Sequence, residues 1–355
     1  MFRNTRHFLL SVLFLQFVVT AQVLSAQPSD LARSLQEGTS DLCPSFEQYS
    51  TQRPDPQGRA TPVWIAVSFV DILSIDDSDQ TFTVDAWLFT SWKDSRLADQ
   101  TRGKAQALCE IDSGKLWTPR LQIRNLRELE TQYPDVMLID SEGIVTLARR
   151  SLIKVFAKFD LEEFPFDQQN LTLTVESLYG IKDVVLHAWN DLVDAREATV
   201  AGWRLGDPIA SAGTEQAKLA ERSIFSMTVI VDREPSFFAR KLFVPVSLIV
   251  FMAYAIFWIS PSLIAPQTGI GATSMLTLIA YQFALSSSLP RISYLTRADF
   301  FLLWALVLVF AALAEAIATA ALMNYGKEGI VRKMDWCFRG LYPLAFVLIV
   351  VLAIF

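Results

Sequence analysis

The chain has 355 residues, of which 52% are hydrophobic and 19% charged, and its formal net charge is −6. Its mean hydropathy is +0.32. This composition excludes a disordered protein, a collagen-like repeat and a disulfide-rich mini-protein, and it is too apolar for an ordinary soluble enzyme.

Residues 1–26 predict a cleavable secretory signal. Arg3 and Arg6 precede a short apolar run, Phe8–Val19, and small residues follow it. The run is shorter than the ~20 residues that a membrane-spanning helix needs. An uncleaved membrane anchor is the alternative. In either case the next part of the chain is exported.

The exported part is acidic. Residues 27–240 carry 22 basic and 33 acidic side chains, which leaves a formal charge of −11. This balance excludes nucleic acid as a partner. Cys43 and Cys109 lie in this part, and they either form a disulfide in an oxidising compartment or remain two buried thiols.

The exported part divides into two regions. Residues 27–61 are rich in Ser, Pro, Gln and Gly and are interpreted as an N-terminal extension. Residues 62–240 predict an extracellular antiparallel β-sandwich of the immunoglobulin-like kind. Apolar and polar residues alternate there, most clearly in Thr81–Leu88, Leu171–Val175 and Met227–Val231.

Residues 241–355 predict a transmembrane domain of four helices. The 49 residues from Leu242 to Pro290 contain no Asp, Glu, Lys, Arg or His. Four apolar stretches are long enough to cross a hydrocarbon core of ~30 Å. The helices are expected at about 242–259, 268–289, 300–323 and 336–355.

The loop between the third and fourth stretches fixes the orientation. Residues 324–335 carry Lys327, Arg332 and Lys333, and basic loops stay in the cytoplasm. The chain is therefore expected to be an integral membrane protein with its N-terminal domain outside the membrane.

The second apolar stretch is too polar to face lipid on all sides, because it contains several Thr and Ser residues. If copies of it surround an axis, one stripe lines a pore that water enters near Thr273 and that Leu276 and Phe283 close. The alternative is that the hydroxyls bond the backbone of their own helix in a packed bundle. The stripe, picked by spacings of three and four, is Gly269, Thr273, Leu276, Ala280, Phe283 and Ser287.

Trp87 falls on the polar side of its strand, opposite an apolar set that includes Ala86 and Leu88. A Trp in that position predicts contact with a partner surface or a ligand. A lone exposed aromatic side chain is the alternative.

Separated motifs then occur in one order. They are TFTVDAWLFTSWKDSRL at Thr81–Leu97, Trp117-Thr118-Pro119, Phe164-Pro165-Phe166-Asp167, Gly202-Trp203, Arg233, Pro245 and Leu289-Pro290-Arg291. With these motifs the chain resembles the pentameric ligand-gated ion channels over about Val63–Phe355, specifically the short bacterial members related to the Cys-loop receptors. Ala157 and Leu171 stand where animal receptors have cysteines, and the loop before the fourth span leaves no room for an intracellular domain. Bacterial members share both departures.

The resemblance implies a homopentamer, with four identical subunits as the partners of each chain and an agonist site between neighbouring sandwiches. It implies a bacterial inner (plasma) membrane location, with membrane lipid and permeant ions as further partners and the N-terminal domain periplasmic or extracellular. The agonist-site candidates are Trp87, Glu176, Leu178, Tyr179 and Ile224.

Leu178 and Ile224 occupy positions where amine-binding relatives have aromatic residues, so an aromatic cage for an ammonium group is incomplete. A small acid, another metabolite or protons fit no worse as the stimulus. If protons act, carboxylates rather than histidine sense them, because His187 is the one histidine left after signal cleavage.

Asp77, Asp167, Arg233 and Pro290 resemble the family's coupling residues at the membrane boundary, where agonist-driven tilting reaches the pore. The alternative is an ordinary surface ion pair worth less than ~1 kcal/mol. Glu315 lies within the third span. It acts there as a proton sensor or a helix link, or it is a protonated acid bonded to a neighbouring helix.

Ion selectivity stays open with a tilt toward anions. Residues 260–267 contain no carboxylate, so the partial positive charge of converging helix N-termini is uncompensated. Gly269–Thr277 also resembles the glycine- and GABA-gated anion channels. In the other direction, many bacterial members conduct cations, and an acidic vestibule concentrates them.

Two rival functions compete with a channel. One is a non-conducting membrane-tethered ligand sensor, but the short inner loop gives a cytoplasmic partner little surface to bind. An exported membrane-anchored hydrolase has only His187 for a nucleophile–base site, and the Cys and His spacing supplies no metal cluster. We therefore expect a channel, not an enzyme, with no cofactor and no metal.

Overall fold

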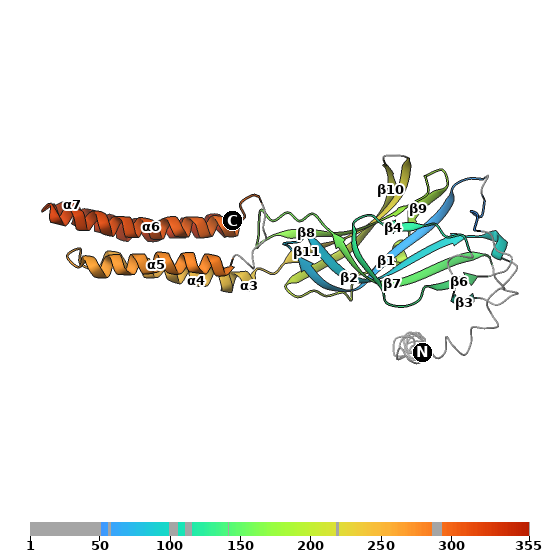
Figure 1. Cartoon of the computed structure of the whole chain (residues 1–355), viewed down its shortest axis with the longest axis horizontal. Helices are drawn as coiled ribbons and strands as arrows, with labels where there is room; N and C mark the ends of the chain where they lie inside the picture. Colours follow the sequence, from blue (N-terminus) through green and yellow to red (C-terminus); the bar gives the residue numbers. More distant parts are fainter. Residues whose placement is uncertain are drawn as a thin grey trace, which may run out of the picture.

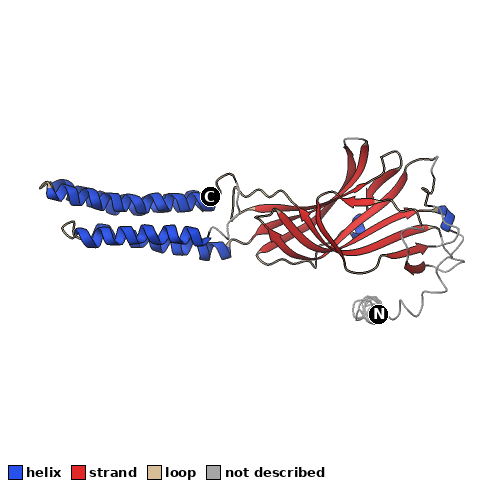
Figure 2. Ribbon diagram, viewed as in Figure 1, coloured by secondary structure: helices blue, strands red, loops and turns tan. Residues whose placement is uncertain are grey.

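A computed structural model of the chain describes residues 51–55, 58–98, 106–110, 116–140, 142–217, 220–285 and 293–354. A sandwich of strands forms one end of an elongated molecule and four long helical segments form the other (Figures 1 and 2). The C-terminal end of the last helix returns to the junction between the two parts (Figure 1).

Several expectations lie outside the described residues. These are the signal over residues 1–26, most of the extension over residues 27–61, Cys43, Ser287 and Pro290. Of Cys109 the structure describes the strand but not the side chain, so the pairing of Cys43 with Cys109 stays a prediction.

Two sheets build the sandwich, as the alternation predicts. The larger sheet has the order β3-β6-β7-β2-β1-β9 with β5 on β7, and the smaller has the order β10-β11-β8-β4. All pairs are antiparallel except β1 with β9. The strands are β1 (Thr61–Asp76), β2 (Thr81–Lys93), β3 (Gln106–Glu110), β4 (Leu121–Ile123), β5 (Leu126–Thr131), β6 (Val136–Asp140), β7 (Ile144–Phe156), β8 (Gln168–Ser177), β9 (Val184–Ala188), β10 (Trp203–Gln216) and β11 (Glu221–Arg233).

The core lies between the sheets because every second side chain of the long strands is apolar. Phe82, Val84 and Ala86 of β2 are fully buried, and so are Phe225 and Met227 of β11. The intervening residues face outward. This alternation fixes which side chains can reach a ligand or a neighbouring chain, because slipping a strand by one residue would exchange the two faces.

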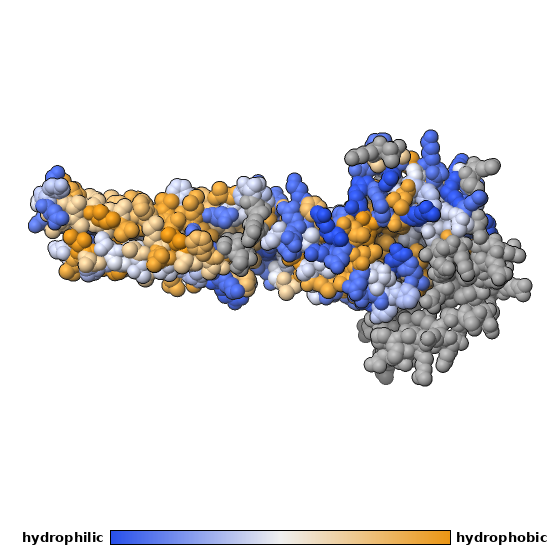
Figure 3. All heavy atoms as spheres, in the orientation of Figure 1, coloured by the Kyte–Doolittle hydropathy of each residue, from blue (hydrophilic) through white to orange (hydrophobic). Residues whose placement is uncertain are grey.

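Within the part of the chain that the structure describes, four helical segments are long and apolar enough to cross a membrane. The first, residues 236–258, is a succession of short pieces, and the other three are continuous. Apolar side chains cover most of the visible face of this part, in contrast to the sandwich (Figure 3). The pieces are α3 (Ser236–Phe238), η4 (Ala239–Phe243), α4 (Val244–Tyr254), η5 (Ala255–Trp258), α5 (Ile264–Leu285), α6 (Arg297–Asn324) and α7 (Glu328–Ile354).

The last three helices begin earlier than hydropathy indicates. The helix α5 begins at Ile264 rather than 268, since Pro266 lies in its first turn, where a missing N–H is tolerated. The helix α6 begins at Arg297 rather than 300, because Thr296 and Asp299 form a capping box.

The inner connection between α6 and α7 is three residues, 325–327, and not the expected loop 324–335. Gly326 adopts φ +68° and ends α6, with the Lys327 N–H donating to the Leu322 carbonyl at 3.0 Å. The polar residues that follow are helical, because a charged residue outside the hydrocarbon core does not stop a helix. The fourth helix therefore begins at Glu328 rather than 336.

Candidate functional site

Glu176 of β8 is buried, with 6% of its surface exposed, among donors from two neighbouring strands. Its Oε2 accepts from Arg124 Nη2 at 2.9 Å, and its Oε1 accepts from Gln122 and, at 3.4 Å, from Arg222 Nη1. Burial by itself would raise the pKa of Glu176, but the hydrogen bonds from Arg124 and Gln122 outweigh it and hold the pKa below its usual value. The carboxylate is therefore committed to its own chain.

Arg124 also bonds Glu215 of β10, with 2.5 Å between Nη1 and Oε2. Glu215 belongs to the β10–β11 hairpin, and its side chain is about half exposed. An ion pair in that position is easily exchanged with solvent or with another anion. Arg124 thus bonds one buried and one half-exposed carboxylate, and the half-exposed one is the easier of the two to exchange.

The structure brings Glu176, Leu178 and Ile224 together, but not Trp87. Ile224 is the register partner of Glu176, and Leu178 follows on the exposed side. Tyr179 turns toward the core instead, with its ring centroid 6.0 Å from that of Trp117. The five candidates therefore do not form one site within a single chain.

Trp87 lies in the other sheet, on the outer face of β2 opposite Arg150 of β7. The Arg150 guanidinium lies 5.9 Å from the Trp87 ring centroid and 5.9 Å from that of Tyr133. It also bonds Asp85, with 2.7 Å between Nη2 and Oδ2. Trp87 is thus part of a cation–aromatic cluster rather than a lone exposed ring.

At the junction with the helices, Arg233 joins Asp77 and Asp167 as predicted. Its Nη1 and Nη2 each lie 2.8 Å from Asp77, and its Nε lies 2.7 Å from Asp167. Gln169 donates to Asp167 from the other side at 2.5 Å. Arg233 is 7% exposed, so the alternative of an ordinary surface pair does not describe it.

Aromatic rings enclose this cluster, which sequence reasoning missed. The Arg233 guanidinium carbon lies 4.0 Å from the Trp203 ring centroid, 4.9 Å from Phe164 and 5.9 Å from Phe238. Burial raises the pKa of Asp77 above its usual value, although the bonds from Arg233 oppose this shift. The nearby charges of Asp167 and Asp76 add to the upward shift.

A second contact across the junction was also missed. Arg297 bonds Glu163 at 2.9 Å, and its Nη1 donates to the Ile354 carbonyl at 2.8 Å. A basic side chain in the first turn of a helix opposes the helix dipole. This unfavourable placement of Arg297 was the one feature of the sequence that indicated a partner for it. Arg297, at the start of α6, thereby joins the loop before Asp167 to the end of α7.

The expected pore stripe on α5 is exposed in the single chain. Leu276 and Phe283 are 69% and 76% exposed, and Gly269, Thr273 and Ala280 are exposed as well. Thr268, Ser274 and Thr277 donate to carbonyls of their own helix, as the alternative interpretation predicts. The opposite face is buried against the bundle at Gln267, Gly271, Ser274 and Leu278.

Glu315 of α6 is 4% exposed, and Asp335 of α7 is its neighbouring acid. The two carboxyl groups lie near the inner end of the bundle, on adjacent helices. Among the described residues, no three His, Cys, Asp or Glu side chains are grouped to hold a metal ion.

Residues 41–224 match the model of the neurotransmitter-gated ion-channel ligand binding domain, and residues 242–339 match that of the neurotransmitter-gated ion-channel transmembrane region. The chain belongs to the neurotransmitter-gated ion channels. Members of this family are ligand-gated channels and not enzymes, so the hydrolase alternative was wrong. They form pentamers and bind small-molecule agonists.

Among similar members, the gamma-aminobutyric acid receptor subunit beta of Caenorhabditis elegans is 27% identical over 78% of this chain and 51% of the relative. The gamma-1 subunit of Rattus norvegicus is 28% identical over 80% and 64%. The human rho-3 subunit is 27% identical over 75% and 59%. The chain thus spans about half to two thirds of the length of these relatives.

Proposed function

We propose that five copies of this chain surround a pore lined by α5, and that a small molecule between neighbouring sandwiches opens it. The Arg233 cluster carries this proposal. It ties the β1–β2 turn, the FPFD loop and the last residue of β11, which leads into the first span, into one buried unit. A tilt of the sandwich therefore reaches the helices through a rigid contact instead of a flexible linker.

We infer that the agonist carries a carboxylate. An ammonium ligand needs a free carboxylate or an aromatic cage, but Glu176 is saturated by its own chain and Leu178 offers no ring face. Partly exposed guanidinium groups lie on both surfaces of a sandwich that would meet in the proposed site. Arg124 and Arg222 lie on the surface that carries Glu176, and Arg150 lies beside Trp87 on the other. A ligand carboxylate can replace Glu215 on Arg124 at little cost.

Three molecules of matched length test the ligand class in bilayer recordings of the purified protein. Butyrate carries only the acid, and butylamine carries only the amine. γ-Aminobutyrate, after which the relatives are named, carries both groups. We expect currents with butyrate and γ-aminobutyrate but not with butylamine. A response to butylamine alone would reject the carboxylate assignment, and saturable binding without any current would support a tethered sensor.

Glu215→Gln sharpens this test, because it removes the carboxylate that competes for Arg124. We expect the acid to act at about tenfold lower concentration, the size of one charge-assisted hydrogen bond. Glu221→Gln is the matched control, since Glu221 is an exposed acid in the same hairpin. Equal shifts in both variants would show a general charge effect rather than competition at Arg124.

We further propose that the pore selects anions and that the chain is one of the short bacterial members in an inner membrane. The exposed residues at the start of α5 bring no carboxylate to the inner mouth, which leaves the helix N-termini positive. The three-residue connection between α6 and α7 supports the short architecture.

A further inference from the structure

Two acidic side chains lie buried at one level of the helical bundle. Glu315 of α6 is 4% exposed, and Asp335 of α7 is 7% exposed. The two helices run antiparallel, and Arg297 Nη1 at the start of α6 bonds the Ile354 carbonyl at the end of α7. Counted from that bond at about 1.5 Å per residue, Glu315 lies about 27 Å and Asp335 about 28.5 Å along the bundle.

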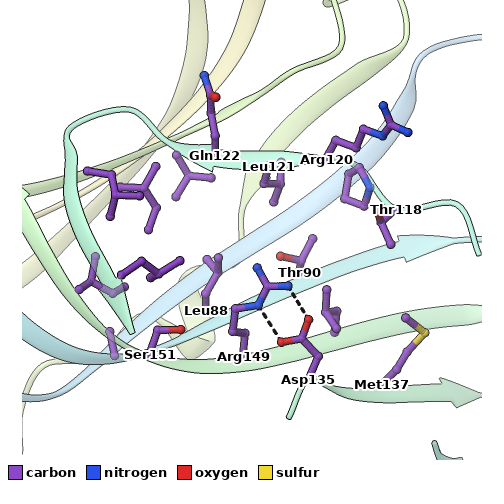
Figure 4. A pocket seen from close by; sticks show the side chains of 18 residues that line it. Leu88, Thr90, Thr118, Arg120, Leu121, Gln122, Asp135, Met137, Arg149 and Ser151 are labelled. Atoms are coloured by element: carbon purple, nitrogen blue, oxygen red, sulfur yellow. Dashed lines mark hydrogen bonds and ion pairs between the residues drawn. The ribbon is translucent and has the colours of Figure 1, made fainter. Parts of the chain in front are cut away.

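The buried acids of the sandwich, in contrast, are each paired with a guanidinium group. These pairs are Asp94 with Arg96, Asp167 with Arg233, and Glu176 with Arg124. The partly buried Asp135 is paired in the same way. It lines a cavity between the two sheets, on the opposite side of β2 from Trp87, and Arg149 bonds it there with 2.7 Å between Nε and Oδ1 (Figure 4).

Glu315 and Asp335 have no such partner. Within the described part of the chain neither forms an ion pair, and Glu315 Oε1 has no hydrogen-bond partner there. Arg339, one turn beyond Asp335, donates instead to the Phe257 carbonyl at 2.8 Å and lies 4.9 Å from the Trp258 ring centroid. Two neighbouring buried carboxylates without a cation repel each other strongly, so they are not both ionised at low cost.

The other groups around the pair do not neutralise it. Between Asp299 and the end of α6 the sequence has no further acid or base, and Tyr281 at the outer end is the one titratable side chain of the described α5. Tyr254 of α4 and Tyr342 of α7 are uncharged phenols that donate to backbone carbonyls. The charged side chains at the inner end of α7 and just before it are exposed, and they are Lys327, Glu328, Arg332 and Lys333. A bound proton is what remains to remove one of the two charges.

We propose that Glu315 and Asp335 form a proton-binding site that responds to the pH of the cytoplasm. With one proton bound, one carboxyl group donates to the other and links α6 to α7. Loss of that proton leaves two negative charges side by side, and the inner ends of the two helices separate. At about 1.5 Å per residue the site lies about 10–14 Å from the inner ends of its helices, so the cytoplasm is its nearer source of protons.

The packing of α6 on α5 connects this site to the pore, a step that rests on the proposed function. Leu313 precedes Glu315 by two residues, and a Cβ added to Gly271 of α5 would lie 2.8 Å from the Leu313 Cδ1. Thr273 of the exposed stripe follows Gly271 by two residues. So close a contact transmits a displacement of α6 to α5. Agonist-evoked current should therefore fall as the cytoplasmic pH rises.

Infrared difference spectroscopy of the full chain in lipid tests the proton site without any current. Exposed carboxyl groups are already ionised at neutral pH, so a carboxylic-acid C=O band that is lost between neutral and alkaline buffer belongs to a buried acid. We expect this band in the wild type but not in the double variant Glu315→Gln/Asp335→Asn. Glu328→Gln, at an exposed acid in the first turn of α7, is the control and should keep the band.

Absence of the band from the wild type, or its persistence in the double variant, overturns the proposal. A gel-filtration profile like that of the wild type shows that each variant is assembled. Should the double variant fail to assemble, Glu315→Gln alone decides. It replaces one carboxyl group by an amide of the same shape, which donates to Asp335 without a proton, and the band should be lost.

Bilayer recordings test the link to the pore, with butyrate as the agonist and the outer pH held constant. Wild-type current should fall at least about threefold as the cytoplasmic pH rises from about 7 to about 9. Glu315→Gln and Asp335→Asn should each remove this dependence, and Glu328→Gln should retain it. A dependence that survives in the double variant refutes the link. A wild-type chain that never conducts contradicts the proposed function instead, and the infrared result then decides the proton site.

Discussion

At the scale of single residues, the junction depends on one guanidinium. Arg233 fills its donors with two carboxylates and its faces with three aromatic rings. A buried ion pair is stable only when its partners are complete, because removing one leaves an uncompensated charge. We therefore expect the loss of Arg233 to destabilise the junction and, under the proposed function, to interrupt a signal that crosses it.

We predict that Arg233→Lys assembles but gives little agonist-evoked current. An ammonium group keeps the charge, but it cannot bond Asp77 and Asp167 in the fixed fork that Arg233 uses. Complete truncation to Ala should also lower the free energy of unfolding by about 3–5 kcal/mol. Arg204→Lys, at an exposed Arg in the same sheet, is the control and should conduct normally. A normal current from Arg233→Lys would remove the residue from coupling.

Asp77 gives a pH prediction. Because its pKa is raised in the folded chain, its ionised form destabilises the fold at neutral pH. This penalty shrinks as the pH falls through the raised pKa, and it is gone once the pH lies below the usual pKa of an aspartate. Asp77→Asn should therefore cost less than about 1 kcal/mol at pH 7, whereas Asp167→Asn should cost about 3 kcal/mol. Thermal unfolding at pH 7 and at acid pH measures both. Wild type and Asp77→Asn should converge in acid, and divergence there would contradict the assignment.

At the scale of elements, α5 has two different faces. Ser274 and Leu278 pack into the bundle, and Leu276 and Phe283 face out of the single chain. Large apolar groups exposed to this degree need a covering surface, which for a membrane helix is lipid, protein or a narrow dewetted pore. The α5 hydroxyl groups that bond the backbone of their own helix do not tell lipid, protein and pore apart, because they make the same bonds in each environment.

Cysteine accessibility distinguishes them. We predict that Thr273→Cys and Ala280→Cys react with charged aqueous thiol reagents when agonist is present, because a water column reaches the stripe in the open state. Ser274→Cys and Leu278→Cys, on the buried face, are the controls and should remain unmodified. Since Cys337 is exposed, the measurements belong in a Cys337→Ser background. Stripe cysteines that are inert in every state would contradict a pore along α5.

At the scale of the whole molecule, the proposed pore forms only when several copies of the chain assemble. The N-terminal end of α5 is exposed in the single chain. It lies within a stretch, Leu242 to Leu285, that contains no charged residue. Five such ends around an axis would present a ring of positive helix dipoles to a passing ion. Stoichiometry and selectivity are therefore properties of the assembly.

We predict a detergent-solubilised particle of five chains whose current reverses near the chloride potential. Ala265→Glu places a carboxylate at an exposed position in the first turn of α5 and should move the reversal potential toward that of cations, whereas Ala265→Gln should leave it unchanged. Mass photometry and bilayer recordings in a chloride gradient make the two measurements. A single-chain particle, or a wild-type reversal at the cation potential, would contradict the respective claim.

Much of the site was predictable from local patterns and the resemblance. Asp77, Asp167 and Arg233 belong to recognisable segments, and the structure places them in contact. The partners of Glu176 were not predictable, because Arg124 is 52 residues away and Arg222 is 46 residues away. Arg149 and Arg150 are neighbours in sequence, and only the pairing of β7 with β2 and β5 shows that one faces a cavity and the other Trp87.

The sequence by itself determined the sandwich, the four spans and the exposed stripe of α5, because these follow from the period of apolar residues along a strand or a helix. Only the tertiary structure decided that Glu176 is saturated, that Arg233 is enclosed by rings and that a cavity lies behind Trp87. Those facts depend on contacts between residues far apart in the chain, and hydropathy along one segment carries no information about its distant partners.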